Sequence, residues 1–171
     1  HGGQIRAHSE GPGRGSQFVA SLPLCKGPAP DAPKSKPMRR GQARPMRVMV
    51  VDDHVDAAQT LAMLIASEGH VCRVAHAPTQ ALEQLAQETA DALVLDIGLP
   101  EMDGRELARR LRARPDTAQS LVVALSGYAR PQDRQAALDA GFDHYLIKPV
   151  DSLQLLDLLS AHAAKLQAQG T

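Results

Sequence analysis

The 171-residue sequence has no tryptophan and only two tyrosines, two phenylalanines and two cysteines. Its hydrophobic core must therefore be built from aliphatic side chains. Cys25 and Cys72 are too few for a disulfide framework, and neither has the neighbours of a metal site. This cysteine content fits a reducing compartment, and we expect a cytoplasmic location.

Long apolar runs are also missing. No run approaches the roughly 20 residues that cross a bilayer, and no signal peptide is recognisable. We therefore expect no membrane contact for these residues. The sequence starts with His1 rather than Met, which we interpret as a fragment of a longer and conceivably membrane-anchored chain.

The net charge is zero, but the two parts of the chain carry opposite charge. Residues 1–46 contain eight Lys and Arg against two acids, a formal charge of +6. Residues 47–171 contain eleven against seventeen, a formal charge of −6. A basic segment can bind nucleic acid or an acidic membrane, but these charges are scattered among prolines and glycines with few aromatic residues. We expect a solvated linker and no nucleic-acid partner.

Three segments follow from composition and periodicity. Residues 1–24 hold two apolar runs, in GQIRAHSE and SQFVASLPL, joined by GPGRG, a pattern that predicts two short strands and a loop. Residues 25–45 are rich in proline, glycine and charge without apolar periodicity, which predicts a flexible linker. Residues 46–171 suffice for one packed domain.

In this domain, short apolar runs alternate five times with segments of helical periodicity. The pattern predicts strands over 47–51, 71–75, 92–96, 121–126 and 144–148, and helices over 55–67, 79–88, 106–114, 132–140 and 152–167. Parallel neighbours need crossover helices, so this alternation indicates an α/β domain with a doubly wound, five-stranded parallel sheet.

Polar residues stand where four of the five strands end. In an open parallel sheet, the binding crevice lies outside the carboxyl ends of the strands. If the strand order is 2-1-3-4-5, the first and third strands are adjacent and their terminal acids converge. The residues at these ends are Asp52, Asp53, Asp96, Ser126 and Lys148.

Three converging carboxylates would repel one another unless a cation joined them, and hard oxygen ligands favour Mg²⁺. A carboxylate held at a strand end can act as a nucleophile toward phosphorus, which suits Asp96. The Lys148 ammonium and the Ser126 hydroxyl would then contact phosphoryl oxygens. The alternative is that these acids are helix N-caps or solvated loop ends.

The segments VVDDH, LVLDIGLPEMDG, ALSG and LIKP resemble the bacterial response-regulator receiver family, and the resemblance covers residues 46–168. It implies the flavodoxin-like (βα)5 fold and phosphorylation of Asp96, which the domain itself catalyses. It also implies that Asp53, Asp96 and the Gly98 carbonyl bind Mg²⁺, with Asp52 acting through a water. Lys148 should precede a cis peptide bond to Pro149. Alternatively, Pro149 only begins the last helix, capped by Asp151 or Ser152.

The same resemblance implies a conformational switch. On phosphorylation, Ser126 would move toward the phosphoryl group and Tyr145 would turn inward, which changes the surface of the fourth helix, fifth strand and fifth helix. This surface could also form a weak homodimer. Tyr145 could instead be a static, half-buried strand residue. Gly98 and Tyr128 should border the site and influence how fast phosphate is lost.

Residues 1–24, with the glycine-rich GPGRGSQF, resemble the closing segment of the histidine kinase ATP-binding domain. The other boxes of that domain are missing, so we expect no ATP site and no kinase activity in this chain. The order of parts indicates the C-terminal receiver of a hybrid sensor histidine kinase. The expected partner is a phosphohistidine domain or a histidine phosphotransfer protein.

Two other functions are compatible with parts of this pattern. A Mg²⁺-dependent aspartyl-nucleophile phosphatase would share the acids, but such enzymes usually carry a second Asp two residues after the nucleophile, where this chain has Gly98. A receiver that docks without phosphorylation is compatible with the fold, but the intact set of polar residues argues against it.

Overall fold

The computed structural model describes residues 2–23 and 44–169. These residues fall into two separate compact units, one containing a hairpin and the other a five-stranded sheet. Most of the expected linker, residues 25–43, lies outside the described residues. Within the described ranges, no helix is long and apolar enough to cross a membrane.

The first unit is a two-stranded antiparallel hairpin, as the two apolar runs predict. Strand β1 spans Gln4–His8 and β2 spans Gln17–Ser21, with Ala7 opposite Phe18. In the connecting loop, the Ser9 hydroxyl donates to the Gly15 carbonyl at 2.8 Å. Every residue of both strands is exposed. A lone hairpin of this kind is marginally stable in water.

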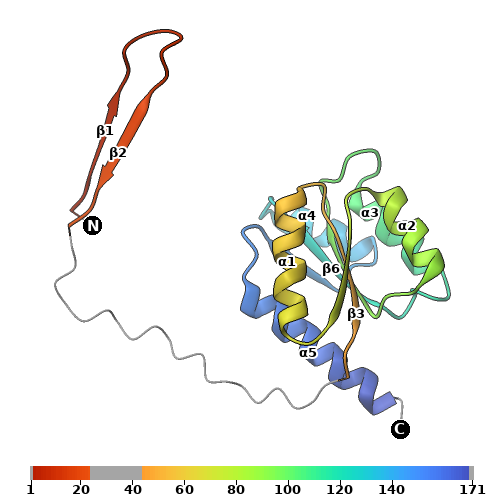
Figure 1. Ribbon diagram of the computed structural model, residues 1–171. Helices are drawn as coiled ribbons and strands as arrows, with labels where there is room; N and C mark the ends of the chain where they lie inside the picture. Colours follow the sequence, from red (N-terminus) through yellow and green to blue (C-terminus); the bar gives the residue numbers. More distant parts are fainter. Residues whose placement is uncertain (1, 24–43, 170–171) are drawn as a thin grey trace. The chain divides into compact units, whose positions relative to one another are not determined.

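The second unit is a parallel sheet with helices on both faces (Figure 1). Its strands are β3 (Arg47–Val51), β4 (Val71–Ala75), β5 (Ala92–Asp96), β6 (Leu121–Ser126) and β7 (His144–Ile147). Its helices are α1 (Val55–Ser67), α2 (Pro78–Gln87), α3 (Gly104–Ala113), α4 (Pro131–Asp139) and α5 (Ser152–Gln169). The strand order is β4-β3-β5-β6-β7, which confirms the expected order 2-1-3-4-5 and the doubly wound fold.

Alternating side chains of the central strands divide the core into two aliphatic clusters. Met49 and Val51 of β3 face α2, α3 and α4, whereas Val48 and Val50 face α1 and α5. Because both faces of the sheet are covered, β5 and β6 are buried along their whole length. Helix α4 contributes little to this core, since Ala137 is its only buried residue.

The loop after β5 folds back so that α3 begins against the end of that strand. The Gly104 N–H donates to the Ile97 carbonyl at 3.1 Å, and Asp103 caps α3 by accepting from the Arg105 N–H at 2.8 Å. A Cβ atom at Gly104 would overlap the Asp96 carbonyl oxygen. The missing side chain therefore allows the contact that positions the segment around Asp96.

We expect Gly104→Ala to lower the free energy of unfolding by about 1–3 kcal/mol, because the added methyl group must displace backbone atoms. Gly127→Ala is the matched control, since a Cβ there meets no atom within 4 Å, and it should not lower stability. Urea unfolding followed by circular dichroism measures both. Equal stability of the two variants would contradict the close-contact explanation.

Candidate functional site

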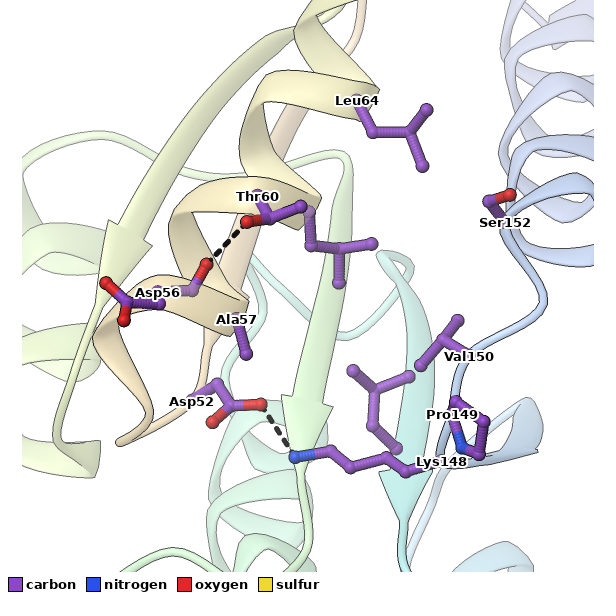
Figure 2. A pocket seen from close by; sticks show the side chains of 11 residues that line it. Asp52, Asp56, Ala57, Thr60, Leu64, Lys148, Pro149, Val150 and Ser152 are labelled. Carbon is purple, nitrogen blue, oxygen red and sulfur yellow. Dashed lines mark hydrogen bonds and ion pairs between the residues drawn. The ribbon is translucent and has the colours of Figure 1, made fainter. Parts of the chain in front are cut away.

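The carboxyl ends of three strands are joined by one ammonium group. Lys148, which follows β7, contacts Asp52 after β3 at 2.7 Å (Figure 2). It also contacts Asp96 at the end of β5 at 2.8 Å. Asp52 and Asp96 are only 2% and 7% exposed. The structure thus brings together residues that lie 96 and 52 positions apart from Lys148 in the sequence.

The two carboxylates control the charge of Lys148. Partial burial of the ammonium favours its neutral form, but hydrogen bonds and charge attraction from Asp52 and Asp96 together outweigh burial, and the pKa of Lys148 is raised. Lys148 is therefore a permanent cation between two acids at physiological pH.

The backbone around Lys148 is fixed on both sides. Its N–H donates to the Ser126 carbonyl at 2.7 Å, which ties β7 to the end of β6. The peptide bond between Lys148 and Pro149 is cis. Asp151 then caps α5, because its Oδ1 accepts from the N–H groups of Leu153 and Gln154 at 2.9 and 3.3 Å.

A group of four potential metal ligands lies beside the ammonium. One ligand atom from each of Asp52, Asp53, His54 and Asp96 lies within 4.8 Å of the other three. The Gly98 N–H donates to Asp96 Oδ1 at 3.0 Å, so Gly98 lies next to the site through its backbone. Carboxylate oxygens are the donors that Mg²⁺ prefers, and the donor set fits such an ion.

Formal charges support the same conclusion. Asp52, Asp53 and Asp96 contribute −3 and Lys148 contributes +1, which leaves −2. One divalent cation would neutralise this remainder. Without a cation, the net charge of −2 costs free energy, because two of the acids are buried.

His54 is the member of this group that the sequence did not identify. Its Nδ1 lies 3.1 Å from Asp53 Oδ1 and 3.4 Å from Asp52 Oδ1. The only available signal was its place directly after the paired acids in VVDDH. A nearby second imidazole, that of His76, contacts the Asp52 carbonyl oxygen at 3.1 Å through Nδ1.

Ser126 and Tyr145 are linked through the backbone of a third residue. The Ser126 hydroxyl accepts from the Tyr128 N–H at 3.1 Å, and the Tyr145 hydroxyl donates to the Tyr128 carbonyl at 2.6 Å. Ser126 is 3% exposed, Tyr145 is half-buried and Tyr128 is 68% exposed. The side chains of Ser126 and Tyr145 thus bind the N–H and the carbonyl of the same residue.

A pocket of about 480 Å³ opens next to the ammonium, between α1 and the segment joining β7 to α5. Figure 2 shows Asp52 and Lys148 at one end of this pocket and Leu64 at the other. Val150 lies on the α5 side. Of the acid cluster, only Asp52 lines this pocket, and most of its other lining is aliphatic.

Comparison with known proteins agrees with this geometry. Residues 48–160 match the model of the response regulator receiver domain family. An uncharacterised 14.6 kDa protein from the sodA1 3′ region of Leptolyngbya boryana is 43% identical over 117 residues, which cover 68% of this chain and 89% of that protein. The response regulator MprA of Mycobacterium ulcerans is 38% identical over 116 residues, which cover 68% of this chain and 49% of MprA.

Solved structures show the same likeness. The receiver domain of the sensor histidine kinase PA1611 from Pseudomonas aeruginosa, which has a magnesium ion coordinated in its active-site cleft, superposes with a TM-score of 0.64. The two are 25% identical, and the match covers 70% of this chain and 98% of that domain.

We expect Lys148→Met to reduce stability in the absence of divalent cations, because it leaves two adjacent carboxylates without their cation. The loss should be about 1–3 kcal/mol, below that of a fully buried pair, since the lysine side chain is 29% exposed. The folded-state pKa of Lys148 lies above its ordinary value of 10.5. Its contribution is therefore complete below that pH and is lost as pH rises through the folded-state pKa.

Urea unfolding of both proteins between pH 7 and pH 11 tests this expectation. The difference in the free energy of unfolding between wild type and Lys148→Met should be constant near neutral pH and should become smaller toward pH 11. Lys165→Met, which removes an exposed lysine of α5, is the control and should change stability little. A pH-independent gap would show that charge is not the cause.

Proposed function

Since the chain belongs to the response regulator receiver family, we propose that residues 46–171 accept a phosphoryl group on Asp96 and use it to change their interaction surface. The observation that carries this proposal is the buried Asp96 carboxylate, held between the Lys148 ammonium and the Gly98 N–H. The donor is a phosphohistidine of a kinase or a histidine phosphotransfer protein. The reaction transfers a phosphoryl group from a histidine nitrogen of the donor to a carboxylate oxygen of Asp96.

In this step a carboxylate oxygen of Asp96 attacks phosphorus, an oxygen–phosphorus bond forms, and the phosphorus–nitrogen bond breaks. The imidazole of the donor leaves with the electron pair of that bond. Bound Mg²⁺ would supply positive charge to the phosphoryl oxygens and the acids that surround them. The residues that would hold it are Asp53 and Asp96, with the Gly98 carbonyl as a direct ligand and Asp52 acting through a water.

Lys148 has a second function in the same step. In the unphosphorylated state its ammonium contacts Asp52 and Asp96 at 2.7 and 2.8 Å. When Asp96 gains the phosphoryl group, its negative charge is replaced by negative charge on the phosphoryl oxygens, which lie further out. The lysine side chain is flexible enough for its ammonium to follow that charge. The magnesium ion in the receiver domain of PA1611 supports the choice of metal.

We expect the 171-residue chain to gain one phosphoryl group from acetyl phosphate only when Mg²⁺ is present, and Asp96→Asn to abolish this gain. Mass spectrometry of the intact protein gives the stoichiometry. Asp56→Asn, which alters an exposed acid in the first turn of α1 outside the acid cluster, is the matched control and should be labelled fully. Undiminished labelling of Asp96→Asn would refute the assignment.

The response would proceed from Ser126 to Tyr145 through Tyr128. A phosphoryl oxygen would attract the Ser126 hydroxyl, which would then give up its bond to the Tyr128 N–H. The loop carrying the Tyr128 carbonyl would be released, and with it the hydroxyl of Tyr145. Phosphorylation shifts such an equilibrium only through contacts that differ between the two states, and the bond from the Ser126 hydroxyl to a phosphoryl oxygen would be that difference.

We expect Ser126→Ala to accept a phosphoryl group on Asp96 but to weaken the structural response. Beryllofluoride serves as the phosphoryl mimic, and NMR chemical-shift changes over residues 127–145 report the response in wild type and variant. The variant should show clearly smaller changes at Tyr145 and in α4. Equal changes in both proteins would show that Ser126 does not transmit the signal.

The wider setting is also a proposal. Residues 1–24 would be the end of a histidine kinase ATP-binding domain, joined by linker residues 25–45 to the receiver of a cytoplasmic hybrid kinase. PA1611, a sensor histidine kinase with a receiver domain, supports the presence of a kinase and a receiver in one chain. A weak homodimer would use the α4–β7–α5 surface, where Leu138 and Ile147 are 38% and 47% exposed.

A further inference from the structure

His54 stands at the start of helix α1 but does not cap the helix with its side chain. It is the N-cap residue of α1, where Ser, Thr, Asp or Asn would bind a free backbone N–H, and its side chain makes no such bond. Its ring instead turns back to the acids, with Nδ1 at 3.1 Å from Asp53 and 3.4 Å from Asp52. The His54 ring therefore belongs to the acid cluster and not to the helix.

We propose that His54 is a nitrogen ligand of the divalent cation site and makes this site prefer a first-row transition-metal ion, such as Mn²⁺, over Mg²⁺. This inference rests on the proposed function, which supplies the cation site itself. It adds a ligand of different chemical character to the carboxylates.

The geometry allows this with small movements. Two ligands with metal bonds of about 2.1 Å lie at most about 4.2 Å apart, and the four ligand atoms here lie within 4.8 Å of one another. The side chains of His54 and Asp53 are 74% and 34% exposed, so both can rotate toward a shared ion without disturbing the core. Nδ1 would bind through its lone pair, with the ring proton on the solvent-facing Nε2.

Charge balance is unchanged by this ligand. A neutral imidazole replaces a water on the ion, and the net formal charge of −2 on the site still requires a dication. His54 therefore affects which dication is bound rather than how many charges it carries. Mg²⁺ keeps its oxygen ligands and loses water reluctantly. Imidazole suits transition metals, and Mn²⁺, which oxygen ligands also suit, accepts an imidazole nitrogen more readily than Mg²⁺ does. The gain from His54 should go to Mn²⁺ and hardly to Mg²⁺.

The test uses the full chain, with Mn²⁺ and Mg²⁺ as the probes. Titration calorimetry gives the dissociation constant of each ion, and pulsed electron paramagnetic resonance detects a nitrogen coupled to bound Mn²⁺. His54→Gln should weaken Mn²⁺ binding about tenfold and Mg²⁺ binding less than about threefold, and should remove the nitrogen coupling. His144 lies at the start of β7, at the other end of this strand from Lys148. His144→Gln is therefore the control and should change none of these values.

A separate variant distinguishes this inference from the cation site on which it rests. Asp53→Asn should strongly weaken both ions. If it does so while His54→Gln leaves the nitrogen coupling and the Mn²⁺ preference intact, His54 is not a ligand and only the inference is overturned. If Asp53→Asn leaves Mn²⁺ binding unchanged, the assignment of the cation site is wrong, and the inference about His54 is overturned with it.

Discussion

The contact of one ammonium with two buried carboxylates is the interaction on which the site depends. Parallel strands place their carboxyl ends at one edge of the sheet, so Asp52 and Asp96 are forced together whatever their charge. The Lys148 ammonium reduces the repulsion between the two carboxylates. The same contacts fix the end of β7 relative to β3 and β5. The remaining negative charge is what would attract the dication of the proposed function. Fold and chemistry are thus coupled through the same three side chains.

Most of the fold could be predicted from periodicity, because aliphatic runs in a doubly covered sheet are nearly continuous and helices such as α2 and α3 are clearly amphipathic. The errors lie at the starts and ends of elements: α2, α3 and α4 start and end one or two residues early, β7 ends one residue early, and α5 extends two residues further than predicted. Helices α2 and α4 begin at Pro78 and Pro131, each one residue before the predicted start. Proline suits the first helical position, since its missing N–H has no partner there in any case. Helix α3 begins at Gly104, two residues early, because the close approach to Asp96 is a tertiary contact.

The site was predictable where chemistry resides in side chains at strand ends and was not predictable elsewhere. Asp96 and Lys148 could be identified because the parallel topology alone brings them to one edge. The family resemblance predicts a coupling of Ser126 to Tyr145 but not its route through the N–H and carbonyl of Tyr128, because backbone groups leave no mark in a sequence. His54 was hidden for another reason: the direction of an exposed ring depends on rotamers that no periodicity encodes.

Helix α4 is attached to the sheet by very little apolar surface. Ala137 is its one buried residue, and a single methyl group contributes only about 0.8 kcal/mol. Such a helix can loosen at small cost, so a small change in free energy on the proposed phosphorylation would be enough to move it. An alanine exchanged for valine or glycine on its inner side would change how readily it responds, while the acids and the lysine at the strand ends remain untouched. Under the proposed function, the readiness of α4 to move could therefore change in evolution independently of the chemistry at Asp96.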